Sequence, residues 1–219
     1  MLPRLTPVAL NLVILNVLAF LGTMMWEPVW GEQVLLQGYP DATGLFDLGR
    51  YALMAWVPTS KYFEPFQVVT SMFMHANFQH LFFNMFSLWM FGSFVETILG
   101  PRRFLTLYLA AGVMGVLLHW AIGYATGTAY VNVPLLGASG AVFGIMIGFA
   151  AIAPDIKIQL LIPPIPIKAK YFALGVAALE FFMGVGSFNT GIAHWAHLGG
   201  ALVGLALVWW WKRGGVGAR

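Results

Sequence analysis

The sequence predicts an all-α membrane protein, a bundle of six transmembrane helices with both termini in the cytoplasm. The first reason is composition: 60% of the 219 residues are hydrophobic and 9% are charged, whereas roughly 25% of the residues in a soluble domain are charged. The second reason is a series of apolar runs, each close to the ~20 residues that cross a bilayer. The third is the distribution of Lys and Arg, which assigns the connections between runs to opposite sides of the membrane.

The apolar runs form a single membrane domain over residues 1–219, with one long outer loop at 27–70. We expect spans near 7–26, 71–95, 104–125, 138–154, 170–187 and 193–211. The first run is long for a signal peptide, and no small-residue cleavage site follows it. We therefore interpret it as a retained span.

Basic residues set the orientation of the bundle. Most of them fall before the first span, after the second, after the fourth and in the tail: Arg4, Arg102, Arg103, Lys157, Lys168, Lys170, Lys212, Arg213 and Arg219. These connections lie on one side of the membrane, which the positive-inside rule makes cytoplasmic. Short loops and the absence of an appended domain favour a bacterial inner membrane, with the site described below opening to the extracytoplasmic side.

Charge and cysteine content exclude several classes of function. The net charge is only +3 and no basic run exceeds two residues, so the chain has no footprint for a nucleic acid. The chain contains no cysteine, which excludes disulfides, thiolate metal sites and a cysteine nucleophile.

Polar residues inside the predicted spans gather at one depth. All five histidines fall towards the outer leaflet: His75, His80, His119, His194 and His197. Ser139 begins the fourth span there, and the spacing of Asn77, His80, Asn84 and Ser87 predicts one polar stripe on the second span. Since polar groups in spans normally face the interior or a water-filled cavity, we expect one cavity that opens outward. Glu180 lies mid-span and away from this cluster, and we assign it a structural hydrogen bond.

Two ridges of small residues predict which spans are neighbours. Glycines or alanine recur at every fourth position of the fourth and sixth spans: Gly140, Gly144, Gly148 and Ala196, Gly200, Gly204. Such ridges let helix backbones approach closely, and their pairing brings Ser139 beside His197. A serine within hydrogen-bond reach of a histidine base is an activated nucleophile. The start of a helix also offers unpaired backbone N–H groups to an oxyanion.

Three short motifs resemble the signature of the rhomboid family of intramembrane serine proteases. They are G-A-S-G at 137–140, H-L-F-F-N at 80–84, and A-H-L-G-G at 196–200 followed by Gly204. The resemblance covers roughly residues 7–211 and implies a six-transmembrane-helix rhomboid-like bundle without metal or cofactor. It implies a dyad of Ser139 as nucleophile and His197 as general base, with no carboxylate. It also implies an oxyanion hole made by His80, Asn84 and the Ser139 N–H, with supporting roles for Gly137, Gly140, Phe143, Gly200 and Gly204.

The sequence departs from the family pattern at two places. Phe66-Gln67 stands where many members have Trp-Arg, which changes how the outer loop is anchored. Phe143 stands where the family often has a tyrosine under the histidine. Because the ring is kept and the hydroxyl lost, we expect stacking and packing to hold His197.

Three functions remain open on the sequence. Taken alone, Ser139 is better explained as a packing residue of a glycine ridge, but the joint arrangement favours a serine endopeptidase. This enzyme would cleave transmembrane protein substrates within the lipid bilayer, near their outer ends. The alternative is a catalytically inert rhomboid-like protein that binds or escorts transmembrane helices. The third is a haem or metal protein that uses the histidines, and the absence of H-E-x-x-H and of a nearby acid weakens it. The sequence makes no prediction of oligomeric state.

Overall fold

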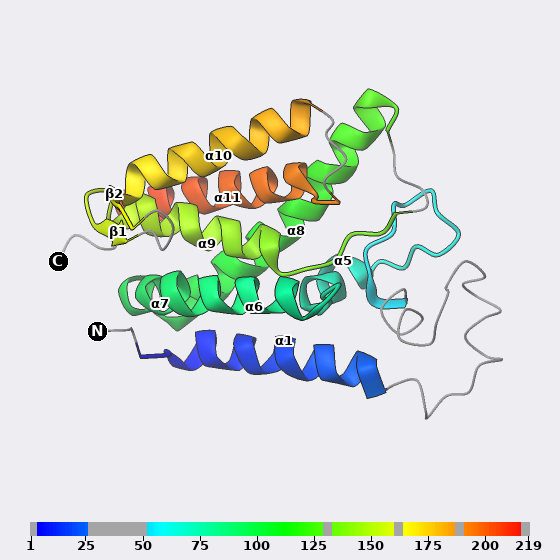
Figure 1. The fold of residues 1–219 in the computed structure, drawn as a ribbon, viewed down its shortest axis with the longest axis horizontal. Helices are drawn as coiled ribbons and strands as arrows, with labels where there is room; N and C mark the ends of the chain where they lie inside the picture. Colours follow the sequence, from blue (N-terminus) through cyan, green and yellow to red (C-terminus); the bar gives the residue numbers. More distant parts are fainter. Residues whose placement is uncertain (1–3, 26–51, 129–132, 160–163, 187–190, 216–219) are drawn as a thin grey trace.

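Long helices that run side by side dominate the computed structural model of the chain (Figure 1). The structure describes residues 4–25, 52–128, 133–159, 164–186 and 191–215. The long elements are α1 (Pro7–Met25), α6 (Phe78–Ser87), the π-helical η2 (Leu88–Gly92), α7 (Ser93–Leu99), α8 (Pro101–Thr126), α9 (Ser139–Ile152), α10 (Ala169–Val185) and α11 (His194–Arg213). The short elements are α5 (Gln67–Thr70), η1 (Ser71–Phe73), β1 (Lys157–Gln159) and β2 (Pro166–Lys168).

Each predicted span overlaps a helix within the described residues. Three stretches there are long and apolar enough to cross a membrane: Pro7–Met24, Phe78–Leu99 and Pro101–Thr126. The chain is thus a multi-pass integral membrane protein. The shorter α9 has 14 residues, or about 21 Å at 1.5 Å per residue. Other helices surround it, since every residue from Gly140 to Ala150 except Phe143 is buried, so its length need not match the thickness of the bilayer.

The second span begins later than the sequence predicts. The expected range was 71–95, but the continuous helix runs from Phe78 to Leu99 and η1 is a separate turn. Asn77 is the N-cap: its backbone is extended, and its side chain accepts a hydrogen bond of 2.9 Å from the N–H of His80. The expectation that Asn77 belongs to the polar stripe is therefore wrong, because an N-cap side chain turns back onto its own helix end.

A buried carboxylate joins α7 to the start of α1. Glu96 accepts hydrogen bonds from the N–H of Val8 at 3.0 Å, the N–H of Ala9 at 2.8 Å and the hydroxyl of Thr6. The start of a helix carries unpaired N–H groups and a partial positive charge, so an acid from a neighbouring helix stabilises it. The sequence analysis missed this cap.

A small hairpin connects α9 to α10. Strands β1 and β2 pair antiparallel, with Lys157 opposite Lys168. Asp155 binds Lys168 at 3.0 Å and Lys170 at 2.9 Å. These lysines, through hydrogen bonds and charge, lower the pKa of Asp155. The connection between α9 and α10 is thus a short hairpin with exposed ion pairs.

Candidate active site

The α9 and α11 helices pack backbone against backbone along the two predicted ridges. A Cβ built on Gly200 would overlap the carbonyl of Gly140, and one on Gly204 would overlap the carbonyl of Gly144. The predicted pairing of the ridges is therefore confirmed. We call this contact the glycine seam.

A third helix completes the glycine seam. A Cβ on Gly115 of α8 would lie 2.7 Å from the carbonyl oxygen of Ala196 and 3.5 Å from the Cα of Gly140. A Cβ on Gly199 would lie 2.7 Å from the carbonyl oxygen of Met114. The sequence analysis missed this helix, although Ala111 and Gly115 show the same spacing of four between small residues. Close contact among three helices leaves little freedom in the relative positions of α9 and α11.

Ser139 is the first residue of α9, and the loop before it holds the ring of His80 nearby. Gly137 has a φ of +117°, in the region that favours glycine, and its N–H donates to the carbonyl of Ser71 at 2.9 Å. A Cβ on Gly137 would lie 2.8 Å from Nε2 of His80 and 3.7 Å from Oγ of Ser139. The imidazole of His80 and the serine hydroxyl therefore border the same small space, and any larger residue at 137 would enter it.

The start of α9 offers hydrogen-bond donors at that space. The first N–H groups of α9, beginning with that of Ser139, have no acceptor within the helix. Asn84 is buried one turn after His80 on α6, and its Nδ2 donates to the carbonyl of His80 at 2.9 Å. This bond uses one of two amide hydrogens. The observed contact of Asn84 is thus to His80 rather than to Ser139.

His197 lies in the first turn of α11, against α9. Its buried ring stacks on that of Phe143, with centroids 4.2 Å apart and planes 8° apart. The predicted stacking is therefore confirmed. Phe143 lies one helical turn after Ser139, so the stack holds the imidazole beside the start of α9.

Glu180 of α10 reaches both histidines at the start of α11. Its Oε2 lies 2.6 Å from Nδ1 of His194, in a hydrogen bond, and 3.0 Å from Nδ1 of His197, an ion-pair distance without hydrogen-bond geometry. The expectations that Glu180 lies away from the histidines, and that no acid lies beside them, are wrong. Position 180 is five residues from the end of α10, and which neighbours it meets depends on how α10 leans on α11.

Glu180, His194 and His197 also form a group with the residue types of a metal site. Their nearest ligand atoms lie within 4.8 Å of one another. Two ligands on a tetrahedral zinc ion at about 2.0–2.1 Å stand roughly 3.3 Å apart, so the 2.6 Å separation of Glu180 and His194 is too short for shared coordination. The geometry is that of a hydrogen-bonded carboxylate.

His75, in the loop between η1 and α6, packs against His80. His75 is 1% exposed, and its ring meets that of His80 edge-on, with centroids 5.0 Å apart. His75 is thus a buried residue rather than a member of the exposed surface around the site. It packs instead as support for His80.

Gln67, at the position of the family's arginine, fastens the loop before α5. It is fully buried, and its Nε2 donates to the carbonyls of Ala52 at 3.2 Å and Tyr62 at 3.0 Å. Its Oε1 accepts from the N–H of Glu64 at 3.0 Å. Phe66 beside it is 51% exposed. The amide thus anchors residues 52–64 to α5.

Comparison with known proteins adds an independent observation. Residues 62–213 match a family model described as "Rhomboid domain". The chain is 35% identical over 150 residues to "Rhomboid protein 1, mitochondrial" of Saccharomyces cerevisiae, which covers 65% of this chain and 41% of that protein.

Two longer matches are to proteins that are also named as mitochondrial and rhomboid-like. The chain is 32% identical over 189 residues to "Presenilin-associated rhomboid-like protein A, mitochondrial" of Danio rerio, covering 78% of this chain and 48% of that one. It is 31% identical over 215 residues to "RHOMBOID-like protein 12, mitochondrial" of Arabidopsis thaliana, covering 92% and 57%. The chain thus spans about half the length of these relatives. Their names place them in mitochondria, so they lend no support to the expected bacterial membrane.

Proposed function

The chain belongs to the rhomboid family, and from that premise we propose that it is an intramembrane serine endopeptidase that cleaves transmembrane protein segments. Ser139 is the nucleophile and His197 the general base. The observation that carries this proposal is the glycine seam, which brings the starts of α9 and α11 together at the residues that bear the hydroxyl and the imidazole.

Acylation begins when Oγ of Ser139 attacks the carbonyl carbon of the scissile peptide bond. Nε2 of His197 takes the hydroxyl proton, and the carbonyl electrons move onto the oxygen. When the tetrahedral intermediate collapses, the C–N bond breaks and His197 returns the proton to the leaving amine. An acyl ester on Ser139 remains.

The oxyanion requires donors that are already in position. The N–H of Ser139, the imidazole of His80 and the amide of Asn84 are proposed for this role. The shared border of His80 and Ser139 around Gly137 supports it. Fixed donors in a dry site stabilise developing charge strongly, because they need no reorganisation during the reaction.

Deacylation repeats the chemistry with water as the nucleophile. His197 takes a proton from water, and the hydroxide attacks the ester carbon. Collapse of the second intermediate releases the new carboxyl terminus and returns the proton to Oγ of Ser139.

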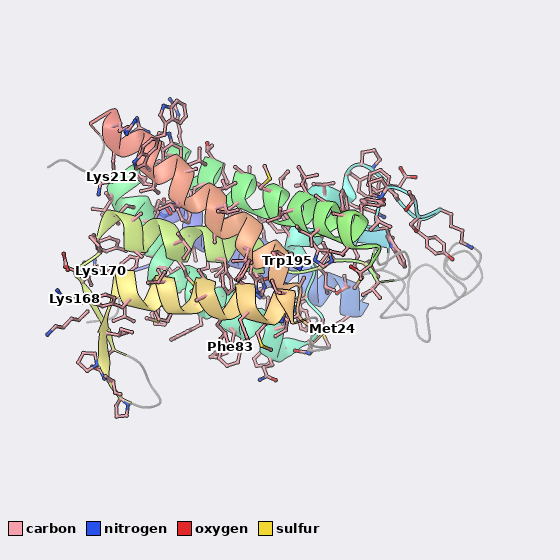
Figure 2. The ribbon with its side chains drawn as sticks, turned by 90° about the horizontal axis from the view of Figure 1, so that it is seen from above. Met24, Phe83, Lys168, Lys170, Trp195 and Lys212 are labelled. Atoms are coloured by element: carbon pink, nitrogen blue, oxygen red, sulfur yellow. The ribbon has the colours of Figure 1, made fainter. Side chains whose placement is uncertain are left out.

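The proposed topology has six crossings, both termini in the cytoplasm and a site that opens to the other side. Two features support it. Lys212 donates to the carbonyl of Ala151 at 3.1 Å, so α9 and α11 run in the same direction and both end near basic residues. Figure 2 shows Lys168, Lys170 and Lys212 at one end of the bundle, and Trp195 and Met24 towards the other.

The proposal is tested by labelling and by turnover on the same preparation. Purified protein is incubated with a fluorophosphonate probe, the labelled residue is mapped by mass spectrometry, and cleavage of a model transmembrane substrate is measured in liposomes. We expect labelling at Ser139 and cleavage that Ser139→Ala abolishes. Alanine suits the start of a small-residue ridge, so the thermal stability of the variant should be unchanged.

Two outcomes would contradict the proposal. Full activity in Ser139→Ala would exclude the serine mechanism. Folded wild-type protein with neither labelling nor cleavage would favour the alternative of an inert member that binds transmembrane helices.

A further inference from the structure

We infer that Glu180 is a positioning residue for His197, an inference that rests on the proposed dyad. The carboxylate holds the imidazole so that Nδ1–H faces α10 and Nε2 faces Ser139. The site then works as a serine and a histidine supported by an acid, rather than as the two-residue dyad that the sequence implied.

The contacts of Glu180 point to this role. One carboxylate oxygen meets Nδ1 of both histidines, at 2.6 Å for His194 and 3.0 Å for His197. The three side chains are 8–12% exposed, so the carboxylate has little water to solvate it. A buried charge must be satisfied by donors, and the ring N–H groups are the donors that face it.

The carboxylate determines which nitrogen of each ring carries the proton. An ionised carboxylate only accepts hydrogen bonds, and a neutral imidazole donates from one nitrogen and accepts at the other. A lone pair on Nδ1 would meet the lone pairs of Oε2 and repel them. The tautomer with Nδ1–H is therefore favoured, and it leaves Nε2 of His197 without hydrogen, as a general base requires.

Glu180 supplies a restraint that Phe143 cannot. The stack at 4.2 Å fixes the plane of the His197 ring. A half-turn about the Cβ–Cγ bond returns the ring to the same plane and leaves the stack unchanged. Such a flip would turn the wrong edge towards Ser139. A hydrogen-bond acceptor on one side of the ring favours one of these two orientations.

The same contact strengthens as the reaction proceeds. When His197 takes the hydroxyl proton, its ring becomes a cation beside an anion. Hydrogen bonds between ionised groups are roughly twice as strong as neutral ones. His80, His119 and His194 also lie near His197, and none of them carries negative charge to share this task.

His194 anchors the carboxylate. Trp195 of α11 packs on Phe181 and Gly184 near the Glu180 end of α10, but these contacts leave the carboxylate itself free to rotate. His194 lies one turn before His197 on α11, and its 2.6 Å hydrogen bond holds Oε2 in place. The pair of histidines thus bridges α11 to α10 through a single oxygen.

The test compares two isosteric substitutions of buried acids. Glu180→Gln removes the negative charge and leaves the shape of the side chain. The matched control is Glu96→Gln, which changes the other carboxylate that fastens two helices, in the cap of α1. Both variants are assayed for thermal unfolding, kcat, KM and the rate at which a fluorophosphonate labels Ser139.

We expect Glu180→Gln to lower kcat and the labelling rate by at least about 10²-fold with little change in KM, since amide replacement of the acid in a serine triad costs up to about 10⁴-fold in kcat. Glu96→Gln should unfold earlier but keep the wild-type kcat per folded molecule. Glu180→Asp, which keeps the charge on a shorter stem, should recover part of the lost kcat.

The outcomes distinguish this inference from the proposed function. Cleavage by wild-type protein, absent in Ser139→Ala, together with a full kcat in Glu180→Gln would overturn the positioning role and leave the protease. Equal losses of kcat in the two glutamine variants would make Glu180 structural only. Inactivation of wild-type protein by a chelator, reversed by zinc, would make the cluster a metal site. An inactive wild-type protein would overturn the proposed function, and this inference with it.

Discussion

The α9 and α10 helices both bring a proposed site residue to the same end of the bundle, but the protein holds them differently. Nearly every residue of α9 is buried, and glycines place its backbone directly against α11. Helix α10 is buried only at Ala169 and Ala173. Its large exposed hydrophobic residues are Tyr171, Leu174, Leu179, Phe181, Phe182 and Val185.

The difference shows that the two helices position their site residues by different kinds of contact. Ser139, the proposed nucleophile, is positioned by a contact between backbones, which tolerates almost no displacement. The carboxylate of Glu180 is positioned by polar contacts with His194 and His197, on a helix whose large side chains are mostly exposed. A substitution at a glycine of the seam should therefore act by displacing the helices, and one at Glu180 by changing the charge beside His197.

The largest expected effect is that of His197→Ala, on α11. Removing the proposed base should lower kcat by about 10⁶-fold, the loss measured when a serine protease loses its histidine. The variant should also fail to label Ser139, because the hydroxyl without a base is a poor nucleophile. His194→Ala removes the hydrogen bond that anchors Glu180, but it leaves the carboxylate facing Nδ1 of His197. Substantial turnover should therefore remain, with a smaller loss of kcat than in Glu180→Gln. Equal loss in both variants would contradict the assignment of the base.

Asn84→Ala extends the comparison of α9 and α10 to a third helix, α6, on which Asn84 lies. If its amide donates to the oxyanion, kcat should fall by about 10²–10³-fold with little change in KM. An interhelical hydrogen bond alone would contribute only about 0.6 kcal/mol, and to stability. Thermal unfolding and turnover on the same preparation separate the two. Earlier unfolding with near-normal turnover would remove Asn84 from the site.

Gly200→Ala tests the glycine seam directly, with Gly175→Ala on α10 as its matched control. A Cβ at Gly200 overlaps the Gly140 carbonyl, whereas nothing lies within 4 Å of a Cβ at Gly175. Overpacking typically costs about 1–3 kcal/mol, and a displacement of about 1 Å at the site lowers turnover by about 10²-fold. Gly175→Ala should be neutral or slightly stabilising. A similar melting temperature in the two variants would show that the glycine seam can accommodate an added methyl group, contrary to this prediction.

The smallest effect is expected for Asp155→Asn, in the connection between the two helices. Its ion pairs with Lys168 and Lys170 are exposed, and exposed pairs contribute little. The folded pKa of Asp155 lies below its ordinary value of 3.8. Its contribution is therefore present above pH 3.8 and is lost as the pH falls through the lower folded value. Thermal unfolding at pH 7 and pH 5 should not distinguish the variant from wild type. A clear drop in melting temperature would assign the hairpin a larger role.

The sequence predicted those parts of the fold that follow from regular spacing. The ridges of α9 and α11 and the stack of Phe143 on His197 depend on intervals of three or four residues within helices, and those intervals have the same meaning in any helix. The start of α6 was misplaced because the apolar pattern continues through η1 into the N-cap at Asn77, and hydropathy does not register a cap. The role of Gly115 was missed because a single pair of small residues on α8 does not indicate that two helices, α9 and α11, pack against it.

The error at Glu180 has a different origin. Its distance along the chain from His197 carries no information on which face of α10 meets α11, or at what depth. The cap of Glu96 on α1 and the loop contacts of Gln67 share this property, because each joins side chains to groups far away in the sequence or in a loop.

By itself, the sequence determined a multi-pass membrane protein of the rhomboid family and the helices that carry Ser139 and His197, because composition, periodicity and short motifs are local properties. Only the tertiary structure decided that α8 closes the glycine seam, that His80 borders Ser139 across Gly137, and that a carboxylate stands behind the histidine. Each of these depends on how helices lean and rotate against one another. Those angles are set by the sum of many packing contacts, and no single stretch of sequence records that sum.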